Sequence, residues 1–263
     1  QTRFALPWGW QEQRIFLRFG SVNYLSEVWL NGARLGAHEG GHLPFEFEIT
    51  AAVQPGENLL VVRVDGNLAP DQVPPGNVPK DPTHSFAQRA YPDANFDFFP
   101  FCGIRRPVIL YCVPAGGIDD LTVVTTIQGK QGRVYVQAEA QGQGSLRFTL
   151  NGHGARVQVG AELNHGVAGA VLEVNRAALW SPQAPNLYEL QVELLQGHKV
   201  VDSYNLPVGI RTISVQGDQL LLNGQPIVLK GFGRHEDFPI NGRGLNPAVI
   251  IKDYELMRWV GAN

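Results

Sequence analysis

Short apolar runs separated by turn residues are the main pattern in the N-terminal part of the chain. Asn31-Gly32, between two such runs, is the strongest short signal for a two-residue β-hairpin. The predicted strands lie at 14–19, 27–30, 33–36, 59–64 and 107–113. Residues 65–95 are rich in Pro, Asp and Gly, which predicts a long irregular loop of the kind that is usually functional. The region therefore predicts a set of short strands that carries one long loop.

The same pattern returns after a composition break at residues 114–117. Short strands are predicted at 121–127, 134–140, 146–150, 167–174, 187–195 and 200–208. About seven short strands within about 100 residues are typical of an immunoglobulin-like sandwich. The sequence therefore predicts a β-sandwich here.

The pattern changes again after Arg211. Residues 220–226 predict a hairpin, and the apolar run 227–231 predicts a short strand. A helix is then predicted to run to about Val260, with Asn246 as its N-cap and Pro247 at its first position, where a missing N–H costs nothing. Gly261 suits the C′ position. A strand, a loop and a helix form one β/α unit, which cannot close a barrel by itself.

Composition narrows the possible functions. The 21 Lys and Arg against 24 Asp and Glu give a formal charge of −3 over 263 residues, which argues against nucleic acid or an anionic membrane as the main partner. No apolar run reaches the roughly 18 residues of a transmembrane helix. Cys102 and Cys112 are too few for a disulfide framework or a structural zinc site and predict two buried thiols or one incidental pair. The start of the chain has no signal-peptide pattern, but its first residues already have the pattern of a mid-strand segment, so the location stays open, with the cytoplasm favoured.

Six segments, in order along the chain, resemble glycoside hydrolase family 2, and within it the β-glucuronidases. They are SVNYLSEVWLNG at 21–32, HEGGHLPF at 38–45, FDFFPFCGIRRP at 96–107, LWSPQAPNLY at 179–188, PVGIR at 207–211 and GFGRHED at 231–237. In β-galactosidases of the family a similar Arg-His-Glu is followed by a second His, whereas Asp237 stands here. This detail favours a glucuronidase, with a β-galactosidase-like enzyme as the alternative.

The resemblance implies a fold and a reaction. The fold is mainly β: a sugar-binding jelly-roll domain at 1–114, an immunoglobulin-like sandwich at 115–213, and the first β/α unit of a (β/α)₈ barrel at 214–263. The reaction is retaining hydrolysis of terminal β-linked sugars, with β-D-glucuronides as the favoured substrates, without a cofactor, by a homo-oligomer. The resemblance also implies that the opening strands of the jelly roll are missing and that both catalytic glutamates lie beyond Asn263. We therefore expect no catalytic residue in this chain, and no activity from it alone.

Two residues are candidates for substrate binding. Asp97 lies in an aromatic run and is either a loop aspartate that caps a turn or a carboxylate that binds sugar hydroxyls beside aromatic rings. His235 follows the predicted barrel strand, where barrel active sites gather, or is a loop histidine bonded to a backbone carbonyl. In the family the equivalent aspartate contacts the sugar, and the histidine belongs to a motif beside the active site. Arg234 and Glu236 are expected to form structural ion pairs.

Other arrangements of polar residues are weaker candidates. His38 and His42 have a spacing that suggests metal, but the glycines between them break any helix that would align both rings, so no metal site is predicted. Glu236 and Asp237 are adjacent, so on an extended segment their side chains point to opposite faces and cannot form a catalytic pair. A non-catalytic carbohydrate-binding or scaffold module remains a further alternative.

Overall fold

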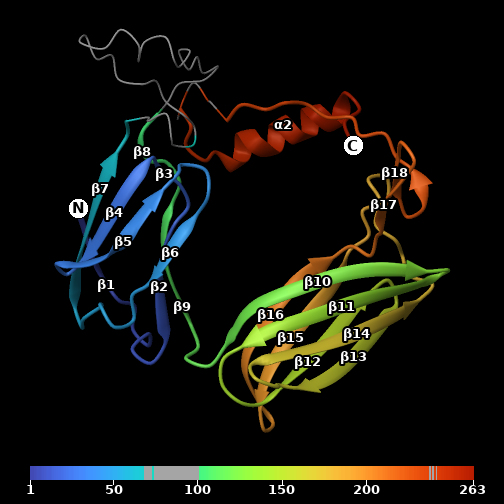
Figure 1. The fold of residues 1–263 in the computed structure, drawn as a ribbon, viewed down its shortest axis with the longest axis horizontal. Helices are drawn as coiled ribbons and strands as arrows, with labels where there is room; N and C mark the ends of the chain where they lie inside the picture. The colour runs from blue at the N-terminus through green and yellow to red at the C-terminus, as the bar shows by residue number, and fades with distance from the viewer. Residues whose placement is uncertain (68–72, 74–100, 237, 239, 241) are drawn as a thin grey trace. The chain divides into compact units, whose positions relative to one another are not determined.

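The computed structural model describes residues 1–67, 73, 101–236, 238, 240 and 242–263 (Figure 1). The chain divides into two compact units, one made of Gln1–Val113 with Phe232–Trp259 and the other of Pro114–Gly231 with Val260–Asn263. Most of the predicted loop at 65–95 lies outside the described residues.

The first unit contains a β-sandwich, as predicted. One sheet has the order β1 (Thr2–Ala5), β7 (Glu57–Asp65), β4 (Leu25–Leu30) and β5 (Ala33–Glu39). The other has the order β6 (Phe45–Glu48), β2 (Arg14–Phe19) and β9 (Val108–Val113), and a short pair is formed by β3 (Val22–Asn23) and β8 (Gly103–Ile104). Alternate residues of β2, namely Ile15, Leu17 and Phe19, are buried in the core between the sheets. The alternation that predicted these strands is therefore the alternation that fills the core.

The hairpin between β4 and β5 turns at Asn31-Gly32, as predicted. Asn31 has φ 51° and Gly32 has φ 84°, the left-handed region that this two-residue turn requires. The Asn31 side chain adds a second function, because its Nδ2 donates to Asn58 Oδ1 at 2.8 Å and its Oδ1 accepts from the backbone N–H of Leu59 at 2.9 Å. The turn is thus bonded to the strand beside it.

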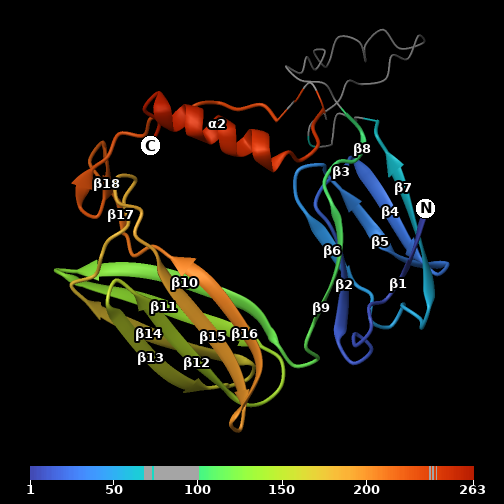
Figure 2. The ribbon, with the colours of Figure 1, turned by 180° about the vertical axis from the view of Figure 1, so that it is seen from behind.

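The second unit contains a seven-stranded sandwich, as predicted (Figure 2). One sheet has the order β10 (Ile118–Gln128), β11 (Gln131–Ala140) and β14 (Val167–Asn175). The other has the order β13 (Ala155–Glu162), β12 (Ser145–Gly152), β15 (Tyr188–Gln196) and β16 (Lys199–Val208). No strand was predicted at β13. Its inward residues include the small Ala155 and Ala161, so its alternation of apolar and polar residues is a weak signal.

A three-stranded sheet follows, formed by β17 (Ile213–Gln216), β18 (Gln219–Leu222) and β19 (Gln225–Pro226). The predicted hairpin is present, with Asn223 and Gly224 at φ 51° and 75°. The strand predicted at 227–231 is wrong, because this segment has no regular structure. Val228 and Leu229 are 73% and 69% exposed. A parallel strand needs a neighbour to take its backbone hydrogen bonds, and none of the described strands pairs with this segment.

Helix α2 (Pro247–Trp259) begins and ends where the sequence predicted. The Asn246 Oδ1 accepts from the backbone N–H of Val249 at 3.3 Å, which is the N-cap bond, and Gly261 has φ +96°, as a C′ glycine does. None of the residues of α2 is fully buried. Within the described ranges, no helix combines the length and the apolar character that crossing a membrane requires.

Both cysteines are free thiols. Cys112 on β9 is half-buried, but Cys102 is exposed, so the prediction of two buried or paired thiols is wrong for Cys102. Cys102 lies against Gly66, where an added Cβ would come within 2.4 Å of the cysteine Cβ. The position of Cys102 is therefore set by this close approach of two backbones.

Candidate functional site

Asp97, the first predicted sugar-binding residue, lies outside the described residues. The two described ends of its loop can be located. Asp65 accepts a hydrogen bond from the backbone N–H of Tyr24 at 2.9 Å, and the carbonyl of Phe101 accepts one from Asn23 Nδ2 at 3.0 Å. Two consecutive residues thus bind the chain on either side of the loop. Asn23 and Tyr24 are fully buried, so both attachments are made inside the sandwich.

His235, the second predicted residue, lies between β19 and α2 in a segment without regular structure. Its side chain is exposed, whereas its neighbours Arg234 and Glu236 are half-buried. This alternation is what an extended segment produces when one face packs on the protein and the other is presented to solvent. The structure therefore gives His235 an outward position on an anchored segment.

The two neighbours of His235 are held by ion pairs, as expected from the sequence. Glu236 Oε2 accepts from Arg106 Nη2 at 2.7 Å, and Arg234 contacts Asp253 on α2 through Nε at 3.0 Å and Nη2 at 2.9 Å. Arg234 Nη1 also lies 3.7 Å from Glu236 Oε1. Its guanidinium stacks over the ring of Phe238 at 5.4 Å from the centroid. A chain of alternating charges thus runs from the residues after β8 to helix α2.

Positive charge gathers beside this chain. Arg105 Nη2 donates to Ser21 Oγ and to the carbonyl of Gly41, both at 3.3 Å. Burial, and then the charge of Arg243, lower the pKa of Arg105. Burial followed by the charges of Arg105 and Arg243 lowers the pKa of His42 below its usual value of 6.5. His42 is therefore neutral at pH 7, and the positive charge of the cluster is that of its arginines.

His38 and His42 take no part in a metal site in the described structure. His38 Nε2 lies 3.1 Å from the carbonyl of Gly40, and its ring stacks on Phe45 with 4.1 Å between centroids. Within the described ranges, no three His, Cys, Asp or Glu side chains gather closely enough to hold a metal ion.

The charged network can position a ligand, but its acids are not placed for acid–base chemistry. Retaining glycosidases use two carboxyl groups about 5–5.5 Å apart on either side of one bond. Glu236 and Asp253 each engage a guanidinium instead. What this part of the chain offers is an exposed imidazole on a segment whose two neighbouring side chains are held by ion pairs.

Asn23 and Arg106 were not among the residues that the sequence predicted to be functional. Both lie within segments that carry the family resemblance, at 21–32 and 96–107. Their partners are 78 and 130 residues away in the chain, so no local pattern indicates the contacts. A polar residue in an otherwise apolar strand was the one available signal for Asn23.

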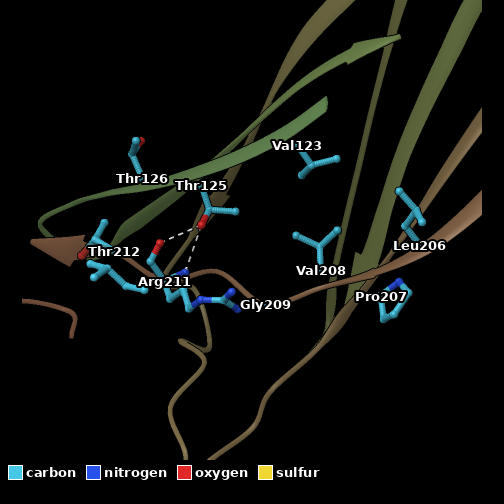
Figure 3. Close-up of a pocket in the computed structure, with 10 residues that line it drawn as sticks. Val123, Thr125, Thr126, Leu206, Pro207, Val208, Gly209, Arg211 and Thr212 are labelled. Atoms are coloured by element: carbon cyan, nitrogen blue, oxygen red, sulfur yellow. Dashed lines mark hydrogen bonds between the residues drawn. The ribbon is translucent and has the colours of Figure 1, made fainter. Parts of the chain in front are cut away.

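The second unit has a surface cavity of about 530 Å³ at the end of its sandwich (Figure 3). Its lining comes from β10, the end of β16 and the residues that lead to β17. Thr125 Oγ1 donates to the carbonyl of Arg211 at 2.7 Å and accepts from its N–H at 3.2 Å. The Arg211 guanidinium lies 4.8 Å from the ring centroid of Trp180. The hydrogen bonds between Thr125 and Arg211 stabilise a turn of the chain. These polar groups of the cavity therefore have a structural role.

The fold is thus two β-sandwiches followed by a small antiparallel sheet and a helix, and comparison with known families identifies the class of protein that has this order of domains. A model of the sugar-binding domain of glycosyl hydrolases family 2 matches residues 1–114, a second family 2 model matches 117–211, and the family's TIM-barrel model matches 213–263. The chain therefore belongs to glycoside hydrolase family 2.

Similar proteins within the family are β-glucuronidases. The chain is 38% identical to the β-glucuronidase of Paenibacillus borealis and 37% identical to that of Rattus norvegicus, over 100% and 98% of its length. It spans 44% and 42% of the lengths of these relatives. The solved structure of Bifidobacterium dentium β-glucuronidase complexed with coumarin-3-O-glucuronide matches all of the chain and 47% of that protein, at 35% identity and a TM-score of 0.87. The Dictyoglomus thermophilum enzyme matches at 38% identity and a TM-score of 0.85, over all of the chain and 45% of that protein.

Proposed function

We propose that this chain belongs to an enzyme that hydrolyses β-D-glucuronides with retention of configuration. The observation that carries the proposal is the identity of 36–38% to β-glucuronidases over 98–100% of the chain. Asp237 after the Arg-His-Glu sequence supports a glucuronidase over a β-galactosidase. In such an enzyme one glutamate protonates the glycosidic oxygen and another forms the glycosyl-enzyme intermediate.

Within that enzyme the chain supplies groups that hold the substrate. Asp97 accepts hydrogen bonds from the sugar hydroxyls, and His235 orients the sugar ring. The jelly-roll domain at 1–114 and the immunoglobulin-like domain at 115–213 support these residues, and residues 214–263 begin the catalytic barrel. The outward position of His235 on a segment held by Glu236 and Arg234 supports this division of roles.

The proposal is tested by chromogenic β-D-glucuronide and β-D-galactoside assays on the protein at its natural full length. Turnover of the glucuronide, and a much lower rate with the galactoside, is expected. A preference for the galactoside would contradict the proposal. The 263-residue chain alone is expected to give no turnover above background.

A second candidate function is carbohydrate binding without chemistry. It is favoured by the match of residues 1–114 to a domain described as sugar binding. Titration of the 263-residue chain with D-glucuronic acid, compared with its Asp97→Ala variant, separates the two. Affinity that Asp97→Ala abolishes supports a binding site within the chain.

Sedimentation of the full-length protein tests the further proposal that it is a homo-oligomer.

A further inference from the structure

The residues on both sides of His235 are attached to different parts of the first unit. Arg234 is held by Asp253 on α2, and Glu236 is held by Arg106, which follows β8. The side chain of Arg234 is only 15% exposed, so this end of the attachment is well covered by protein. His235 is therefore the exposed residue of a three-residue segment with two supports.

Arg106 is itself a rigid support. Its backbone N–H and that of Arg105 both point to the carbonyl of Ser21, at 3.4 and 3.0 Å. The N–H of Gly20 donates to the carbonyl of Pro107 at 3.0 Å, and a Cβ added to Gly20 would lie 2.9 Å from the Arg106 Cβ. Only glycine permits this close approach. The guanidinium that holds Glu236 thus projects from a backbone fixed against the sandwich.

The same short stretch of chain follows residue 100 directly, and so comes soon after Asp97 in the sequence. Phe101, whose carbonyl is bonded to Asn23, lies five residues before Arg106 in the sequence, and β8, which pairs with β3, lies between them. The Arg106–Glu236 pair therefore connects the segment that carries His235 to the residues that follow the β3–β8 pair. It is a contact between residues 130 positions apart in the chain.

We propose that Glu236 is a positioning residue for His235 and acts through Arg106. The pair is about two-fifths exposed, so its contribution to global stability is small. Its effect is on placement, where an error of about 1 Å at a substrate-orienting group can cost up to about 100-fold in rate. The part of this inference that concerns sugar hydrolysis rests on the proposed function.

The placement of His235 is tested directly by NMR on the 263-residue chain. The imidazole ¹³Cε1–¹Hε1 signals of the seven histidines are recorded, and that of His235 is assigned by its loss in His235→Gln. Glu236→Gln changes the charge next to His235 whatever its role, so Arg106→Gln is the decisive variant. We expect Arg106→Gln to shift and broaden the His235 signal and to speed amide exchange at residues 234–236 about two- to fivefold.

The matched control is Glu46→Gln, which breaks an exposed Arg–Glu pair of 2.9 Å on the same sandwich. It should leave the His235 signal unchanged. A His235 signal and exchange rates that match the unmodified chain in Arg106→Gln would overturn the proposal.

The functional consequence is tested in the full-length enzyme. Arg106→Gln and Glu236→Gln should each lower kcat/KM for a β-D-glucuronide about tenfold, mainly through kcat, and neither should lower it further when His235 is already Gln. Additive losses would show that Glu236 acts independently of His235 and would overturn the proposal. Absence of glucuronidase activity would refute the proposed function instead, and the NMR result would still decide whether Glu236 positions His235.

Discussion

The two sandwiches of this chain are stabilised in different ways. In the described structure the second sandwich has a core of 17 buried residues, all apolar or aromatic, whereas the first has a core of eight. Of the buried polar residues described, one, Thr149, lies in the second sandwich. The other four, which lie in the first, are Ser21, Asn23, Ser26 and Asn58.

The buried polar groups of the first sandwich hold loops in place. Asn58 binds the backbone of Gln54 in both directions, at 2.9 and 3.0 Å, and Asn23 holds the carbonyl of Phe101. Ser21 Oγ donates to the carbonyl of Gly41 at 2.6 Å. Hydrogen bonds have direction, so they fix a loop in a way that apolar packing cannot. The comparison teaches that the sandwich beside the proposed site uses polar contacts for placement, while the other is a scaffold stabilised by apolar burial.

The largest effect is expected in the apolar core of the second sandwich. Phe148 is fully buried, and Phe148→Ala removes a large apolar surface and leaves a cavity. We expect a loss of about 3–5 kcal/mol in the free energy of unfolding, measured by denaturant titration. Val124→Ala, at a 53% exposed position, is the control and should cost far less. A small loss for Phe148→Ala would contradict the conclusion that the second sandwich is stabilised by apolar burial.

A smaller but still large effect is expected from a buried polar residue of the first sandwich. Asn58→Ala leaves the backbone N–H and carbonyl of Gln54 without their partner and removes one of the two acceptors of the Asn31 amide. We expect a loss of about 2–3 kcal/mol in the free energy of unfolding, because each unsatisfied buried group costs about 1–3 kcal/mol. Asn205→Ala, on an exposed position of β16, should have little effect. Equal losses for the two variants would mean that Asn58 is no more important than a surface residue.

The hydrogen bonds beside the cavity in Figure 3 allow a test of whether polar contacts stabilise the second sandwich as much as they stabilise the first. Thr125→Val keeps the shape of the side chain but removes both hydrogen bonds to the backbone of Arg211. We expect a loss of about 1 kcal/mol in the free energy of unfolding, measured by thermal denaturation, because Thr125 is only half-buried. Thr122→Val on the exposed face of β10 is the control. A loss as large as that of Asn58→Ala would contradict the division between the two sandwiches.

The smallest effect is expected from a surface ion pair, and it depends on pH. The hydrogen bond from Arg147, at 2.7 Å, lowers the pKa of Glu193 below its usual value of about 4.5. Because the carboxylate is favoured in the folded state, its contribution is present above pH 4.5 and is lost as the pH falls through the lowered pKa. Glu193→Gln should therefore cost at most about 1 kcal/mol at pH 7 and nothing near pH 2.

Unfolding of the unmodified chain and of Glu193→Gln, followed from pH 7 to pH 2, measures this difference. Glu189→Gln, exposed on the same strand, is the control. A difference that grows as the pH falls would have the wrong sign and would refute the assignment.

Local signals in the sequence predicted local structure well. Asn31-Gly32 and Asn223-Gly224 turn hairpins because Asn and Gly accept positive φ at low cost, and Asn246 caps α2 because its side chain reaches the N–H of Val249. The prediction failed at residues 227–231, where apolar residues were read as a strand although a strand also depends on its neighbours. Asp97 and His235 came from a family resemblance, and their roles in substrate binding stay predictions.

The amino-acid sequence by itself determined the class of fold, the hairpin turns and the helix ends, because each depends on the backbone preferences of a few adjacent residues. It also carried the family, through short motifs spread along the chain. Only the tertiary structure decided that Asn23 reaches Phe101 and that Arg106 reaches Glu236. These contacts join residues far apart in the chain, and such partners become neighbours only after the sheets have formed, so no window of sequence contains them.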